Sequence, residues 1–340
     1  MLQGGLEEEA LPGDAAPAIG LVLGAGGVVG QAYQVGVLAA LEREAGWDPR
    51  EAAIIVGTSA GSVTGTALRV GVPASDLAAS TYGVAPSHTG GALLKRILPD
   101  ESPLPVPSVI SLLRPWSPPS PALIGRVARR PWAFRPEVAA ATLLPRGQID
   151  ISARAHALHE LVGDDWPRGL WICAARRADG GRVVFGRDGS PSTPLAAAVL
   201  ASCAIPGYFR PITIDGTEYF DGGVHSATNA DVLKAEHLDV VIVVSSMSAS
   251  EGRVAGVDGL LRRSVRHRLE REIARLEARG TAVIRLEPGP RARRAMGLWA
   301  MAEDRAPRVV EAAYEETRSR ILSNPGLATL VARGPASAAG

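Results

Sequence analysis

Short runs of aliphatic and β-branched residues recur along the chain, separated by longer stretches in which apolar positions have helical spacing. The runs at 18–23 and 53–56 each lead into a glycine-bearing turn and then into a helical pattern. This strand–loop–helix–strand–turn–helix order predicts parallel strands in an α/β sandwich. Further strands are predicted at 170–175, 181–185, 212–214, 217–220, 239–244 and 281–286, and further helices at 193–202, 260–279 and 302–322.

Prolines crowd the segment between about residues 86 and 145 far too densely for the core of a sheet. Apolar clusters lie between these prolines, together with Trp116 and Trp132. We predict a Pro-rich helical insert or cap over about 86–150, within a single domain that spans 17–325. Two interpretations stay open: a packed surface subdomain, or a lid that admits an apolar substrate or makes peripheral contact with a membrane through 86–145.

Charge, cysteine content and the length of apolar runs argue against several classes of protein. The net charge of +1 gives no electrostatic case for nucleic acid as a partner. The only two cysteines, Cys173 and Cys203, suit a reducing, cytoplasmic compartment, and no cluster of residues has the spacing of metal ligands, so no metal is predicted. No apolar run reaches the ~18 residues that span a bilayer. Residues 1–16 are predicted to be a disordered leader without signal-peptide character, and 326–340 a loose tail.

The most informative motif is a serine between two glycines, in the order Gly57-Thr58-Ser59-Ala60-Gly61, directly after the second predicted strand. A turn this tight leaves no room for side chains beside the serine, which explains the glycines at 57 and 61. Such a turn projects the Ser59 hydroxyl at the mouth of the sheet, beside a helix N-terminus. An ordinary strand-to-helix turn would have the same pattern, so the rest of the chain has to supply a base and an oxyanion hole.

A glycine loop over 24–30 follows the first predicted strand and opens a helix, so that its backbone N–H groups can point into a site. A dinucleotide-binding loop would need glycine where Val29 stands, and an acidic residue about 20 positions further on is missing. The other interpretation is an oxyanion hole, in which the N–H groups of Gly26 and Gly27 bind the negative charge on an attacked ester carbonyl.

Asp221 is the candidate base, because it ends a predicted hairpin strand and two glycines, Gly222 and Gly223, follow it. The glycines let the chain pack closely and leave the carboxylate free to reach a neighbouring strand end. Partial desolvation would raise the low basicity of a carboxylate. By itself Asp221 could also be a turn or cap residue, and His225 remains an alternative base, since histidine is the usual partner of a nucleophilic serine.

Taken together, these motifs resemble those of the patatin-like phospholipases. The supporting segments are 23–30, 57–62, 201–209 and 220–224, within regions of similarity that cover 18 to about 75 and 170–246. The chain departs from the common loop pattern of the family in two ways. Ala25 and Val29 stand in the glycine loop, Val29 where the family has arginine, and the spacing from Gly30 to Gly36 is one residue longer.

The resemblance implies a three-layer α/β/α sandwich with a mostly parallel central sheet. It also implies a lipid acyl hydrolase without cofactor, in which a Ser–Asp dyad cleaves lipid or fatty-acyl esters. Ser59 would be the nucleophile and Asp221 the base, with Gly26 and Gly27 as oxyanion donors and Val28 beside them at the substrate. Two alternatives stay open: an α/β-hydrolase with a Ser-Asp-His triad drawn from His225, His237 or His267, and a non-catalytic lipid-binding protein on the same fold.

Overall fold

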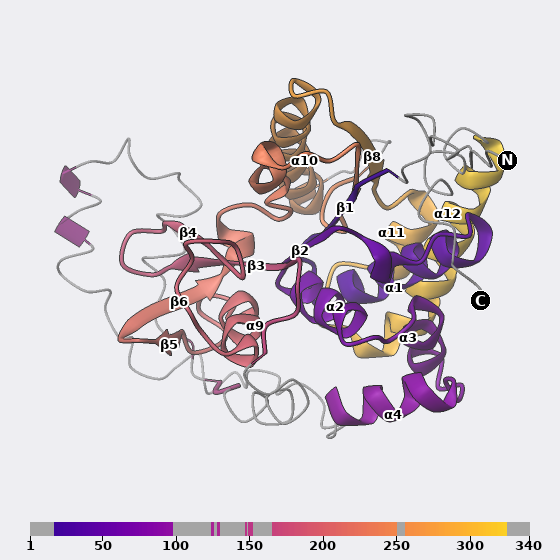
Figure 1. The fold of residues 1–340 in the computed structure, drawn as a ribbon, viewed down its shortest axis with the longest axis horizontal. Helices are drawn as coiled ribbons and strands as arrows, with labels where there is room; N and C mark the ends of the chain where they lie inside the picture. Colours follow the sequence, from indigo (N-terminus) through magenta and orange to yellow (C-terminus); the bar gives the residue numbers. More distant parts are fainter. Residues whose placement is uncertain are drawn as a thin grey trace, which may run out of the picture.

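The computed structural model describes residues 17–97, 124–125, 128–129, 147, 149–151, 165–249 and 256–324. Within these residues the strands form one eight-stranded sheet between helices (Figure 1). Its strand order is β5-β6-β3-β2-β1-β7-β8, and β4 pairs with β3 outside this path. The strands are β1 (Ile19–Leu23), β2 (Ile54–Thr58), β3 (Leu170–Arg176), β4 (Arg182–Phe185), β5 (Ile212–Ile214), β6 (Thr217–Asp221), β7 (Val240–Val244) and β8 (Ala282–Leu286).

The centre of the sheet is parallel and one end is antiparallel. Strands β3, β2, β1, β7 and β8 run in the same direction, whereas β4 and β6 pair antiparallel with β3, and β5 pairs antiparallel with β6. This mixed, mostly parallel sheet confirms the predicted fold class. The antiparallel pairing sets Asp221 opposite Ala174 of β3, near the carboxyl ends of the central strands.

Helices cover both faces of the sheet and complete the three layers (Figure 1). One face packs against α1, α2, α3, α9, α11 and α12, and the other packs against α10 and a short 3-10 helix, η4. The α-helices are α1 (Gly27–Glu44), α2 (Ala60–Arg69), α3 (Ala74–Thr81), α4 (His88–Ile97), α9 (Leu195–Cys203), α10 (Gly256–Glu277), α11 (Pro290–Met296) and α12 (Ala306–Ser323). The 3-10 helices are η1 (Pro49–Glu51), η3 (Gly222–Val224), η4 (Ala230–Ala235) and η5 (Glu303–Arg305).

The alternation of side chains along β1 shows how the sequence specifies two cores. Leu21 and Leu23 lie in the larger core with α1 and α12, and Val22 between them lies in the smaller core with α10. All three side chains are fully buried. A strand buried on both faces needs a continuous apolar run rather than alternating polarity, and this is the pattern the sequence has at 19–23.

The predicted strands and the main helices are confirmed, with two differences at the ends of elements. Strand β2 continues to Thr58, and α1 begins at Gly27, so the predicted loop 24–30 is shorter than expected. Val28, Val29 and Gly30 therefore belong to the first turn of α1. Helix α11 was not predicted. The residues that follow it, 297–301, line the candidate active site.

Most of the predicted insert, 86–150, lies outside the described residues; α4 covers its beginning. The expected leader at 1–16 and tail at 326–340 lie outside them as well. The domain boundaries and the function of the insert stay predictions. In the part of the chain that the structure describes, no helix has both the length and the apolar character needed to cross a bilayer.

Candidate active site

Ser59 lies on the turn between β2 and α2 and has a strained backbone conformation. Its φ of 53° and ψ of −122° are rare for any residue with a side chain. Close packing accounts for both neighbouring glycines. A Cβ atom on Gly57 would lie 2.6 Å from Ser62 Cα, and one on Gly61 would lie 2.0 Å from the carbonyl oxygen of Leu23. The geometry is that of a nucleophile elbow.

Hydrogen bonds on both sides hold the backbone of this turn. The Ser59 N–H donates to Ser202 Oγ at 2.8 Å, and Ser202 Oγ donates to the Cys173 carbonyl at 2.7 Å. Ser62 donates its N–H (2.8 Å) and its hydroxyl (2.7 Å) to the Ser59 carbonyl. Ser202 was not predicted as a support, because its contact depends on how α9 docks against the sheet. The turn is thus fixed by β3 and α9 as well as by α2.

Asp221 ends β6 and lies against the elbow. Its backbone N–H donates to the Ala204 carbonyl at 3.0 Å, and its Oδ1 accepts the Gly223 N–H at 2.7 Å. The Ser59 hydroxyl lies beside this carboxylate and lowers its pKa. A Cβ atom at Gly222 would lie 2.3 Å from the Cys173 carbonyl oxygen, so only glycine allows this close approach. The structure therefore brings the two residues of the predicted dyad together.

The surroundings of Asp221 make it more basic than an ordinary carboxylate. Burial raises its pKa to about 6, while the hydrogen bonds from Ser59 and from the Gly223 N–H lower the pKa and offset part of that rise. Both side chains are buried, Ser59 and Asp221 at 5% exposure each. A carboxylate with this pKa is ionised at neutral pH and still accepts a proton more readily than a surface aspartate.

The predicted oxyanion loop lies at the N-terminus of α1. Gly26 is the N-cap residue and Gly27 has a φ of +62°, which favours glycine. The N–H groups of Gly26, Gly27 and Val28 have no hydrogen-bond partner among the described residues, as expected for the first turn of a helix. These donors and the helix dipole favour a negative charge at this point.

A segment from the far end of the chain fixes this loop. The Val29 N–H donates to the Ala300 carbonyl at 3.1 Å, and a Cβ atom on Gly27 would lie 2.7 Å from the same oxygen. On the other side Ser246 Oγ donates to the Ala25 carbonyl at 2.7 Å. Neither support was predicted, since neither belongs to a recognisable motif. Val29 stands where the family has arginine, and in this chain its backbone N–H contacts the Ala300 carbonyl.

A cavity of about 460 Å³ opens over Ser59 and Asp221. Apolar side chains supply most of its lining, and Val29 rather than Val28 is among them. The loop after α11 contributes one wall. The lining residues are Ala25, Gly26, Gly27, Val29, Ser59, Ile205, Pro206, Tyr208, Asp221, Gly223, Val224, Ser246, Met247, Leu261, Arg262, Met296, Gly297, Leu298, Trp299, Ala300 and Met301. A long apolar group could therefore lie beside the serine.

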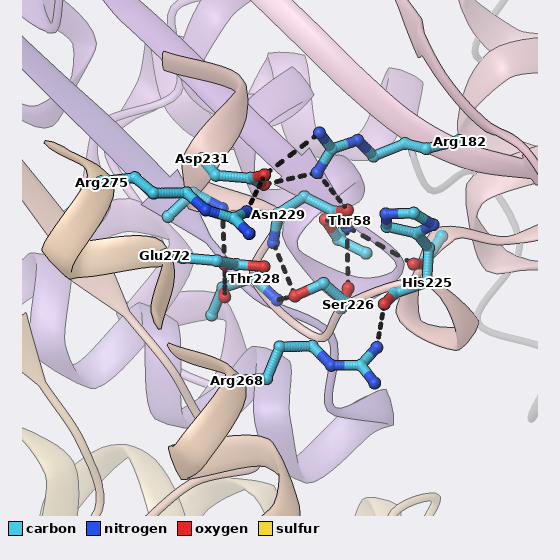
Figure 2. A network of polar contacts seen from close by, with 12 residues as sticks. Thr58, Arg182, His225, Ser226, Thr228, Asn229, Asp231, Arg268, Glu272 and Arg275 are labelled. Atoms are coloured by element: carbon cyan, nitrogen blue, oxygen red, sulfur yellow. Dashed lines mark hydrogen bonds and ion pairs between the residues drawn. The ribbon is translucent and has the colours of Figure 1, made fainter. Parts of the chain in front are cut away.

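A buried polar network (Figure 2) contacts the chain neighbours of both dyad residues. Asn229 Nδ2 donates to Thr58 Oγ1 (3.1 Å), to the Gly222 carbonyl (3.4 Å) and to the Ser226 carbonyl (2.7 Å). Thr58 precedes the elbow serine and Gly222 follows Asp221, so a single amide contacts both. Asn229 is itself left-handed, with a φ of 53°, a conformation that asparagine tolerates better than most residues.

Glu272 of α10 holds this network in place through hydrogen bonds. Its Oε2 accepts the Thr228 hydroxyl at 2.6 Å and the Ala230 N–H at 2.9 Å. Burial raises the pKa of Glu272, and hydrogen bonds from Ser226 and Thr228 work against that rise. Nearby, Asp231 forms ion pairs with two arginines, which contributes to its lowered pKa (Figure 2). None of these residues was predicted to belong to the site.

The histidines considered as alternative bases lie elsewhere. Of the residues that line the cavity, none is His225, His237 or His267. His225 follows η3, and Figure 2 shows it within the polar network, where its carbonyl accepts a hydrogen bond from Arg268. The described residues also contain no group of three or more His, Cys, Asp or Glu side chains placed to hold a metal ion. The geometry thus favours the carboxylate over a histidine.

The fold and this site define a class: an α/β sandwich that carries a G-x-S-x-G serine on a nucleophile elbow. The chain belongs to the patatin-like phospholipase family, whose model matches residues 21–234. This range includes the glycine loop, Ser59 and Asp221. No curated protein matches the chain significantly.

Solved structures with a similar trace have low sequence identity. The chain is similar to VipD from Legionella pneumophila (14% identity, TM-score 0.43), with 91% of this chain and 67% of VipD covered. It is also similar to the ExoU–SpcU complex of the type III secretion system of Pseudomonas aeruginosa (17% identity, TM-score 0.32). There the match covers 91% of this chain and 53% of the other, so the chain spans about half the length of that relative.

Proposed function

We propose that this protein is a serine acyl hydrolase that cleaves fatty-acyl esters of lipids. The observation that carries the proposal is that the elbow serine, Ser59, and the buried carboxylate of Asp221 lie beside each other and line one cavity. Gly26 and Gly27, whose N–H groups have no hydrogen-bond partner among the described residues, line the same cavity. A nucleophile, a base and an oxyanion site are the three parts that acyl transfer needs.

In the first half of the reaction, Asp221 takes the proton of the Ser59 hydroxyl while Ser59 Oγ bonds to the ester carbonyl carbon. The carbonyl oxygen becomes negatively charged, and the N–H groups of Gly26 and Gly27 stabilise it. The tetrahedral intermediate then collapses and breaks the bond to the alcohol. The leaving alkoxide takes the proton from Asp221, and the fatty acyl group stays on Ser59 as an ester.

The second half repeats these steps with water. Asp221 takes a proton from the water as its oxygen attacks the acyl carbon, and the same N–H groups hold the second oxyanion. Collapse breaks the bond to Ser59 Oγ, which recovers its proton from Asp221, and the fatty acid leaves. A base with a pKa of about 6 suits both directions of proton transfer near neutral pH.

Two features support a lipid as the acyl donor. The family to which the chain belongs is one of phospholipases by description. The cavity beside Ser59 is walled by long apolar side chains, including Met247, Met296 and Leu298. Such a wall gains free energy by removing an alkyl chain from water, at about 0.8 kcal/mol per buried methylene.

The Ser59→Ala variant tests the proposal against a panel of phospholipids, lysophospholipids and glycerides. Fatty-acid release by the wild type should fall by at least about 10³-fold in the variant, because the nucleophile is gone. Labelling by a fluorophosphonate probe should disappear as well. Ser80→Ala is the matched control, since this serine is exposed on α3 and its variant should keep both properties.

Two outcomes would contradict the assignment. Fluorophosphonate labelling that persists in Ser59→Ala would show that another residue is the nucleophile. A wild-type protein that binds lipid vesicles and releases no fatty acid from any member of the panel would indicate a non-catalytic lipid-binding protein. The melting temperature of each variant shows whether a loss of activity reflects chemistry or unfolding.

A further inference from the structure

Three large apolar side chains stand exposed at the mouth of the cavity. Leu298 is 88% exposed, Trp299 is 55% exposed and Leu261 is 51% exposed. All three also line the cavity above Ser59; we call them the rim. Exposed apolar side chains that gather around one opening mark an interaction surface more often than scattered ones do.

Backbone hydrogen bonds hold the segment that carries two of the rim residues, Leu298 and Trp299. The Gly297 N–H donates to the Arg293 carbonyl at 3.1 Å and the Ala302 N–H donates to the Trp299 carbonyl at 3.2 Å. Between these bonds, the Ala300 carbonyl accepts the Val29 N–H. Leu298 and Trp299 thus project from a loop that is tied at both ends and in its middle. Their exposure is built into the fold.

The segments that carry the rim residues are rich in arginine. Residues 256–301 contain eleven arginines and five acidic residues. Arg263 is close to Leu261 in sequence and Arg294 is close to Leu298; both arginines are exposed, and neither forms an ion pair with another described residue. Exposed apolar side chains on an arginine-rich part of the chain match a bilayer surface that carries anionic headgroups. Tryptophan in particular is favoured at the boundary between headgroups and acyl chains.

We propose that the rim is a membrane-docking surface for bilayers that contain anionic phospholipid. Leu261, Leu298 and Trp299 enter the interfacial region, and Arg263 and Arg294 contact the headgroups. Docking then places the mouth of the cavity against the lipid, so that an acyl ester can reach Ser59 without crossing bulk water. This deepens the proposed function by naming a bilayer as the source of the substrate. The contact lies on a different segment from the predicted insert.

Vesicle flotation measures docking separately from hydrolysis when all proteins carry Ser59→Ala, which leaves the lipid intact. We expect this protein to float with vesicles of phosphatidylcholine and phosphatidylglycerol. Adding Leu298→Ser and Trp299→Ser should lower the partition coefficient at least about tenfold. Leu322→Ser is the matched control, because Leu322 is 61% exposed on α12 and does not line the cavity. It should float like its parent.

The arginines and the tryptophan give two further readouts. Arg263→Gln with Arg294→Gln should weaken flotation with anionic vesicles and leave less dependence on salt. Brominated lipids should quench the fluorescence of the protein, and Trp299→Phe should remove most of that quenching. Quenching that stays the same in Trp299→Phe would overturn the proposal, because the tryptophan would then lie away from the bilayer.

Equal flotation of the rim variant and its parent would also overturn the proposal. A third result would overturn it as well: the wild type is a dimer that does not bind vesicles, and the rim substitutions convert it to a monomer. The rim would then be an interface between two copies of the chain. If the protein with Ser59 intact docks on vesicles but releases no fatty acid, the proposed function is contradicted and the docking surface is still supported. If the protein releases fatty acid from dispersed esters but does not dock on vesicles, the proposed function is supported and the docking surface is contradicted.

Discussion

The cavity has a floor and a wall that are built on different physical principles. The floor consists of Ser59, Asp221 and the residues behind them, is buried, and depends on hydrogen bonds between distant parts of the chain. The wall is the segment 296–301, which presents apolar side chains and is held by backbone contacts. The floor specifies positions of individual atoms, whereas the wall specifies a surface.

This difference predicts different effects of substitution. A change in the floor displaces reacting atoms, and a displacement of about 1 Å can cost roughly 10²-fold in rate. A change in the wall alters how much apolar surface the substrate buries, which affects binding in steps of about 1–3 kcal/mol. The two regions meet where Ala300 contacts the glycine loop.

Removing the base should have the largest effect on the floor. We expect Asp221→Asn to lower kcat by about 10³- to 10⁴-fold, because the amide cannot accept the serine proton. In the wild type, kcat/KM should rise with pH through about 6 and then level, since only the ionised carboxylate acts as the base. A pH–rate profile of both proteins with a soluble ester checks this, and near-normal turnover in the variant would point to another base.

The same substitution should make the protein more stable at neutral pH. The folded-state pKa of Asp221 is raised to about 6, above its ordinary value of about 4. The stability that goes with the protonated form is present below pH 4 and is lost as pH rises through about 6. Asp221→Asn removes this loss, so we expect a gain of about 3 kcal/mol at pH 7.5 and almost none at pH 4. Denaturant unfolding at both values measures it, and a gain that is equal at both would contradict the linkage.

The parts of the floor that could be predicted from the sequence are those set by local chemistry. Gly57 and Gly61 are needed because backbone atoms lie within 3 Å of where a Cβ would stand, and a tight strand-to-helix turn always has this need. Asp221 followed by glycines has a similar local reason. The strands were predictable because buried parallel strands require continuous apolar runs.

Contacts between distant segments could not be predicted. Helix α1 begins at Gly27 in spite of its glycines, because packing against α12 overrides helix propensity. A Cβ atom on Gly36 would lie 2.4 Å from the Val310 carbonyl oxygen, so glycine allows these helices to approach. The wall and Asn229 belong to no recognised motif. Ser202 lies in a segment that resembles the family, but its hydrogen bond with the Ser59 N–H depends on how the fold docks α9.

A substitution at the junction of floor and wall should have the next largest effect. Gly27→Ala adds a Cβ atom that would lie 2.7 Å from the Ala300 carbonyl oxygen, at a residue with a φ of +62°. The oxyanion loop or the wall must move, so we expect kcat to fall by roughly 10²- to 10³-fold. Steady-state kinetics with a soluble ester and a long-chain lipid checks both regions in one variant.

Gly46→Ala separates backbone strain from the contact with the wall. Its φ is +66°, yet a Cβ atom there meets nothing within 4 Å. It should cost about 1 kcal/mol in stability and leave kcat unchanged. If Gly27→Ala also kept its kcat at a similar loss of stability, the N–H groups of this loop would not be the oxyanion donors.

The smallest of these effects is expected at Asn229, which supports the floor and does not line the cavity. Asn229→Gly keeps a residue that tolerates the left-handed φ and removes the amide that joins Thr58 to the Gly222 carbonyl. We expect kcat to fall roughly tenfold with KM changed less than about twofold. The pKa in the pH–rate profile should rise, because a loosened dyad weakens the Ser59 hydrogen bond that lowers the pKa of Asp221.

The direction of that pKa change tests positioning against a general loss of stability. Asp215→Gly is the matched control, since Asp215 is also left-handed, with a φ of 45°, and lies in the exposed turn between β5 and β6. It should leave both kcat and the profile unchanged. A variant at 229 with lower stability, normal kcat per folded molecule and an unshifted profile would show that the network supports the fold alone. A raised pKa with reduced kcat would show that the amide holds Asp221 against Ser59.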